Sequence, residues 1–156
     1  MTLDVFVEGC EDSFECKYGG FTLFRCQIFK GWNQELGKLY EQKYGFIWDK
    51  KNSIGLAGFF CIQSGFYKNI DKRMDQILEE YDRPYNEGMK ILFNHSDCDG
   101  EITPDECVLL LKSFGRVDPD KFDKDEDYHD WYLESFDIWK KMMAYAIENN
   151  QSILFG

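Results

Sequence analysis

The segment at residues 94–106, NHSDCDGEITPDE, constrains the fold of this chain more than any other stretch. Its last part, TPDE at 103–106, is a capping box with proline at the first helical position, which predicts the start of a helix. Asp97, Asp99 and Gly100 are residue types that form tight turns. The segment therefore predicts a sharp turn that leads the chain directly into a helix.

The same segment has the spacing of a twelve-residue calcium loop. If Gly100 is the sixth residue, oxygen-bearing side chains fall on alternate positions and position 12 is a glutamate able to offer two oxygens. The candidate metal ligands at positions 1, 3, 5, 7 and 12 are His95, Asp97, Asp99, Glu101 and Glu106. Imidazole nitrogen is a poor ligand for calcium. The predicted cofactor is therefore a divalent cation: calcium, or manganese or zinc if His95 is a ligand.

Two other interpretations of this loop stay open. In the first, Glu106 only completes the capping box and the aspartates only cap nearby amides, so that the loop is a structural turn. In the second, the carboxylates bind a protein partner. Unneutralised carboxylates repel one another by about 1 kcal/mol per close pair in water. A bound cation or a basic partner would relieve that repulsion.

The residues that flank the loop match a calcium hand on one side only. After it, apolar residues at helical spacing predict a helix over Pro104 to Gly115 that packs on the core. Before it, Gly88 and the apolar residues Met89, Ile91, Leu92 and Phe93 suggest a chain that enters in extended form. For His95 we consider a metal ligand, a hydrogen-bonding cap and an acid or base, of which the cap is favoured.

The unit HSDCDGE at residues 95–101 resembles a segment of small bacterial and bacteriophage proteins of unassigned function, in which it precedes a helix. The resemblance implies a bacterial or viral cytoplasmic origin, and it groups His95 with the aspartates. It implies no activity. The loop also looks like an EF-hand calcium loop, from which His95 departs.

The net charge of −11 is concentrated in one part of the chain. Residues 95–130 carry −8 of it, whereas residues 1–94 carry only −2. We therefore expect an acidic edge formed by residues 95–130. Binding to nucleic acid begins with the neutralisation of phosphates, so the chain is not expected to contact nucleic acid directly. A cation or a basic protein surface fits this charge better.

The remaining patterns predict an α+β fold: a mostly helical single domain over residues 1–156, with a small sheet from the N- and C-terminal strands. Residues 13–32 fit either a hairpin closed by two glycines or a strand followed by a helix, and the helix is favoured. Residues 46–67 fit core packing or a ligand-lining segment, and core packing is favoured. The other expected elements are a strand at 2–8, helices at 33–45, 69–81, 84–89 and 128–149, a solvated linker at 116–127, and a strand at 152–156.

Cysteine usage and hydropathy indicate the cellular compartment in which the protein is expected. The chain has six cysteines without a CxxC motif and without a basic, apolar leader, so we interpret them as reduced thiols in or near the core. No run approaches the roughly 18 apolar residues of a membrane span. We expect a soluble, cytoplasmic protein that is not exported and does not contact membranes.

Three functions follow from these patterns. The first is a non-enzymatic regulatory or inhibitory protein that acts through protein contacts, its loop shaped by a divalent ion. The second is a metal-dependent hydrolase in which His95, Asp97 and Asp99 hold the ion and Glu101 or Glu106 activates water. The third is an acidic mimic of nucleic acid. The first is favoured, since no nucleophile with an adjacent base supports an enzyme.

Overall fold

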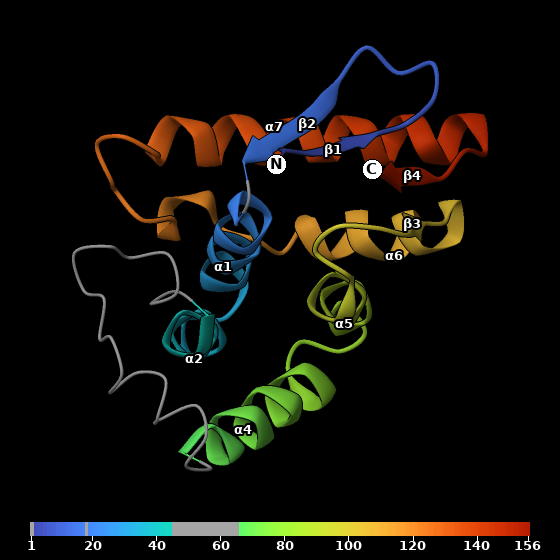
Figure 1. Ribbon diagram of the computed structural model, residues 1–156. Helices are drawn as coiled ribbons and strands as arrows, with labels where there is room; N and C mark the ends of the chain where they lie inside the picture. Colours follow the sequence, from blue (N-terminus) through green and yellow to red (C-terminus); the bar gives the residue numbers. More distant parts are fainter. Residues whose placement is uncertain (1, 18, 45–65) are drawn as a thin grey trace.

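The computed structural model describes residues 2–17, 19–44 and 66–156 (Figure 1). Most of the segment 46–67, interpreted above as core or ligand lining, lies outside these residues. The elements in chain order are β1 (Thr2–Phe6), β2 (Ser13–Lys17), α1 (Gly20–Trp32), α2 (Gln34–Tyr44), α4 (Phe66–Glu80), α5 (Asn86–Asn94), β3 (Glu101–Ile102), α6 (Pro104–Phe114), the short 3-10 helix η3 (Pro119–Lys121), α7 (His129–Asn149) and β4 (Ile153–Phe155). The predicted α+β fold, mostly helical, is confirmed.

The sheet is antiparallel and has the order β2-β1-β4-β3. The two terminal strands pair, as predicted, with Val5 opposite Phe155. On its other side β4 pairs with β3, where Ile153 lies opposite Ile102. The C-terminal strand therefore connects the N-terminal strand to the acidic loop.

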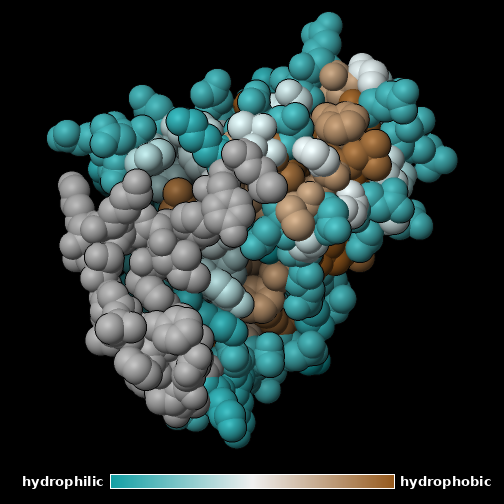
Figure 2. Space-filling view, viewed as in Figure 1, coloured by the Kyte–Doolittle hydropathy of each residue, from teal (hydrophilic) through white to brown (hydrophobic). Residues whose placement is uncertain are grey.

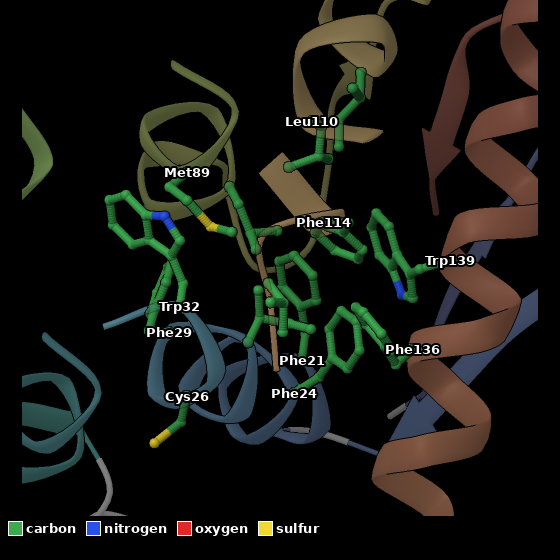
Figure 3. Packing of buried hydrophobic residues seen from close by; sticks show 14 of the residues in the cluster. Phe21, Phe24, Cys26, Phe29, Trp32, Met89, Leu110, Phe114, Phe136 and Trp139 are labelled. Carbon is green, nitrogen blue, oxygen red and sulfur yellow. The ribbon is translucent and has the colours of Figure 1, made fainter. Parts of the chain in front are cut away.

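Aromatic side chains fill the space between α1, α6 and α7 (Figure 3). Trp139 of α7 is fully buried, and the rings of Phe21 and Phe24 stack on it with centroids 5.9 and 5.5 Å away. Phe114 of α6 stacks on Phe136 of α7 at 5.4 Å. Such pairs contribute about 0.5–1.5 kcal/mol beyond the area that they bury. Helix α1 therefore lies inside the molecule, with nearly every residue after Gly20 buried.

Two predictions for the first half of the chain are decided by the hydrogen bonds. Residues 13–17 form a strand that pairs with β1, and helix α1 follows, so the alternative of a hairpin within 13–32 is wrong. The predicted N-cap of α2 is confirmed, because the side-chain oxygen of Asn33 accepts a hydrogen bond of 2.9 Å from the Leu36 amide.

The prediction of an extended chain before the loop is wrong, because residues 86–94 form helix α5. Met89 and Leu92 stand at helical spacing and are fully buried. Gly88 lowers the helix propensity of this stretch, but its missing side chain lets α5 approach the backbone of α6 at Leu109 and Leu110. Close packing between the two helices thus outweighs the propensity of one residue.

The residues of the expected acidic edge fall into two stretches at opposite ends of α6 (Figure 1). The loop at 95–103 precedes this helix and residues 118–130 follow it. At a rise of about 1.5 Å per residue, α6 separates them by roughly 16 Å. The segment after α6 is also less solvated than predicted, because Val117 and Phe122 are buried.

The five cysteines within the described residues are all free, in agreement with the prediction of reduced thiols. Cys16, Cys26 and Cys107 are buried, whereas Cys98 is exposed and does not belong to the core. Burial raises the pKa of the Cys107 thiol to about 12. In the part of the chain that the structure describes, no helix has both the length and the apolar character to cross a membrane.

The contact between α5 and α6 predicts that Gly88→Ala destabilises the protein. The added methyl group would lie 2.6 Å from the Leu109 carbonyl oxygen and from the Leu110 Cα. We expect a loss of about 1–3 kcal/mol in the free energy of unfolding, measured by urea denaturation, although alanine favours helices. Glu87→Ala, at an exposed site on the same helix, should change it by no more than about 0.5 kcal/mol. An unchanged or raised stability of Gly88→Ala would contradict this packing.

Candidate functional site in the loop between α5 and α6

Helix α5, the loop that follows it and helix α6 form a helix-loop-helix unit. In Figure 1 helix α5 is seen along its axis while α6 runs across the view, so the loop turns the chain sharply. Gly100, at the sixth position, has φ +98°, a conformation that favours glycine. Glu101 and Ile102 then form β3. A helix thus adjoins the loop at each end, whereas the sequence pattern predicted one only at its C-terminal end.

Asp97 forms an ion pair with Arg25 of α1, which the sequence analysis did not assign to the site. The guanidinium group also donates a hydrogen bond of 2.9 Å to the His95 carbonyl and one of 3.4 Å to the Leu92 carbonyl. It lies 4.4 Å from the ring centroid of Phe21, and Arg25 is only 4% exposed. A buried cation from another helix therefore holds the start of the loop.

His95 contacts the protein through both ring nitrogens. Nδ1 lies 2.8 Å from the Ser96 carbonyl oxygen and Nε2 lies 3.2 Å from the Glu101 carbonyl oxygen. The ring packs on Phe155 of β4, with centroids 4.1 Å apart. Carbonyl oxygens only accept, so a neutral ring donates one of these bonds and a protonated ring donates both. Of the three roles considered for His95, this geometry favours the cap.

Glu106 forms the predicted capping box with Thr103. The Thr103 amide donates to the Glu106 carboxylate at 3.0 Å, and the Glu106 amide donates to the Thr103 hydroxyl at 3.2 Å. Position 12 of the loop thus has the role of a helix cap in this structure.

The remaining carboxylates of the loop point to solvent. Asp99, Glu101 and Asp105 are exposed, and none of their side chains forms a hydrogen bond or ion pair with another described residue. Among residues 2–17, 19–44 and 66–156, no three His, Cys, Asp or Glu side chains gather as they would around a metal ion. The predicted ligands share one loop, but His95, Asp97 and Glu106 contact separate partners and Asp99 and Glu101 point to solvent. The metal site remains a prediction.

A second polar cluster joins α1 to the other acidic stretch. The Lys30 side chain is 9% exposed, and its ammonium group pairs with Asp123, at 2.9 Å, and with Glu41 of α2. Burial alone would lower the pKa of Lys30, but the hydrogen bonds with Glu41 and Asp123 outweigh it, so the pKa is raised. Gln27 adds two bonds to Asp123, of 2.8 and 3.0 Å.

Neither buried cation was predicted from the sequence, although a signal was present. Arg25 and Lys30 interrupt an otherwise apolar pattern in the stretch FTLFRCQIFKGW, residues 21–32. A cation inside an apolar helix must find acceptors once the helix is buried. The most acidic stretches of the chain were available as those acceptors.

Comparison with protein-family models, with curated proteins and with solved structures finds no match for this chain. Its function is therefore inferred from its own residues.

The capping box predicts different effects for two substitutions of Glu106. Glu106→Ala removes the acceptor of the Thr103 amide and should lower the free energy of unfolding by about 1 kcal/mol. Glu106→Gln keeps an acceptor oxygen and should remain within about 0.5 kcal/mol of the wild type in urea denaturation. An equal loss in both variants would show that the negative charge matters rather than the cap.

The buried ion pair of Lys30 predicts a pH-dependent effect of Asp123→Asn. Because the pKa of Lys30 is raised in the folded state, its stabilisation is complete below the unfolded value of 10.5 and is lost as the pH rises through the folded value. Asp123→Asn should therefore lower the free energy of unfolding by about 1–2 kcal/mol near neutral pH. The difference from the wild type should shrink in urea denaturation at pH about 11.

Asp120→Asn is the matched control, since Asp120 is exposed in the same segment. It should leave the free energy of unfolding unchanged within about 0.5 kcal/mol. If the effect of Asp123→Asn were constant from neutral to alkaline pH, Lys30 would not be its partner.

Proposed function

We propose that this chain is a non-enzymatic regulatory or inhibitory protein that binds a basic protein surface through the exposed carboxylates of the loop between α5 and α6. The proposal rests on one observation: some polar side chains of the loop make internal contacts, whereas others are exposed. Asp97, Glu106 and His95 hold its shape through internal contacts. Asp99, Glu101 and Asp105 are left exposed.

A preordered loop of this kind suits recognition of a charged partner. Pairing of β3 with β4 and the capping box of α6 fix the two ends of the carboxylate set. A partner that binds a loop already in its final shape does not have to offset the entropy of ordering it. Exposed charges mainly accelerate association and select partners of the opposite sign.

The surface as a whole supports a polar contact. Hydrophilic residues cover most of the coloured surface in Figure 2, and the hydrophobic surface of that face gathers mainly in its upper right half. Polar surfaces with a local excess of charge bind through electrostatic complementarity more than through apolar burial.

The other two hypotheses are less well supported by this geometry. A hydrolase would need His95 and Asp97 directed at one ion, whereas they contact backbone carbonyls and Arg25, respectively. A mimic of nucleic acid would need charge along a continuous face. The separation of the two acidic stretches by α6 favours a localised contact instead.

The proposal predicts weaker binding when the exposed carboxylates of the loop are neutralised. The triple variant Asp99→Asn/Glu101→Gln/Asp105→Asn should bind a fluorescent lysine-rich peptide about tenfold more weakly than the wild type at low salt, because each lost charge removes a fraction of a kcal/mol. Fluorescence anisotropy measures this affinity.

A second triple variant, Asp120→Asn/Glu126→Gln/Asp127→Asn, removes the same number of exposed charges at the other end of α6. It should keep the wild-type affinity within about twofold, since its charges lie outside the proposed surface. Equal losses in the two variants would show that only net charge attracts the peptide, and the proposed surface would be abandoned.

A further inference from the structure

We propose that Arg25 supplies the positive charge of the loop between α5 and α6 from within the chain, in the place where a calcium hand would hold a metal ion. This inference goes beyond the proposed function, because it concerns what orders the loop and whether that order depends on an ion.

The first support is the set of groups that the guanidinium contacts. Asp97 stands at position 3 of the loop, where a calcium hand has a carboxylate ligand. In this chain it pairs with Arg25. The His95 carbonyl, at position 1, accepts from the same group at 2.9 Å. One cation thus collects two oxygens from the entrance of the loop.

The second support is the end of helix α5. Its last carbonyls have no amide partner within the helix and carry the negative end of the helix dipole. The Leu92 carbonyl lies 3.4 Å from Arg25, and the loop begins directly after Asn94. The guanidinium therefore neutralises both the helix end and the first carboxylate of the loop.

The third support is the burial of the cation. Arg25 is 4% exposed and its guanidinium lies over the ring of Phe21. A charge taken out of water needs fixed acceptors, and the planar fork of arginine serves several at once. Loop and cation therefore require each other.

On the far side of the loop, His95 takes the place of another contact that a metal ion would make. In a calcium hand the position-7 carbonyl coordinates the ion. In this chain that carbonyl, of Glu101, lies 3.2 Å from the Nε2 atom of His95, and the ring rests on Phe155. The two departures from a calcium loop, the histidine at position 1 and an arginine aimed at position 3, thus act together. The loop is ordered without an ion.

Thermal melting tests the inference. It needs no binding partner, so a failure of the inference can be distinguished from a failure of the proposed function. A ligand that binds the native state must raise the Tm. Because the loop is proposed to hold no ion, the wild-type Tm should differ by no more than about 1 °C between EDTA and millimolar calcium, manganese or zinc. Arg25→Met should lower the Tm by about 10 °C. Arg25→Lys should recover only part of that loss, since lysine lacks the fork.

A double-mutant cycle tests the pairing itself. Asp97→Asn should lower the Tm in the wild type and have a much smaller effect in the Arg25→Met background, or in Arg25→Lys if Arg25→Met does not fold. Asp99→Asn, at an exposed site in the same loop, is the matched control and should behave alike in both backgrounds.

Two results would overturn the inference. One is a wild-type Tm that rises with a divalent ion and loses this rise in Asp99→Asn, which would show that the loop holds a metal. The other is an effect of Asp97→Asn that is the same whether or not Arg25 is present.

Discussion

The burial of helix α1 is the constraint on which the rest of the structure depends. Most of its residues are covered by α2, α7 and the sheet, yet it carries Arg25 and Lys30. Each buried cation must find oxygens nearby, because an unpaired charge in the interior is far more costly than a paired one. Arg25 takes them from the loop after α5, and Lys30 takes them from Glu41 and Asp123. The two acidic stretches at opposite ends of α6 are thereby each tied to one cation of α1.

Patterns of hydrophobicity and turn chemistry were sufficient to predict most elements of the fold. The capping box at Thr103, the N-cap at Asn33 and the pairing of the terminal strands depend on local residue types or on alternation, and all three are present. The helix predicted at 84–89 covers the first part of α5, but the stretch directly before the loop was predicted as extended because Gly88 weakens the local helical signal. The contact that stabilises α5, with the backbone of α6, is set by the tertiary fold and has no signature within residues 86–94.

Only part of the contacts in the candidate site can be predicted from the sequence, and the reason is physical. The turn that Asp97, Asp99 and Gly100 predict is present, and Gly100 has a positive φ. The spacing of the loop does not identify the charge partner, because Arg25 lies seventy residues earlier in the chain. The spacing of residues in a loop predicts which oxygens the loop presents. Which cation contacts those oxygens depends on the residues that the tertiary fold places opposite the loop.

The C-terminal strand also stabilises the loop between α5 and α6. The short strand β3 needs a partner strand for its amide and carbonyl groups. In this chain β4 provides it, since Ile153 pairs with Ile102 and Phe155 donates to the Gly100 carbonyl at 3.1 Å. Phe155 also supports the ring of His95. The C-terminal strand and the buried arginine thus hold the two sides of the loop, and together they fix its shape through contacts within the chain.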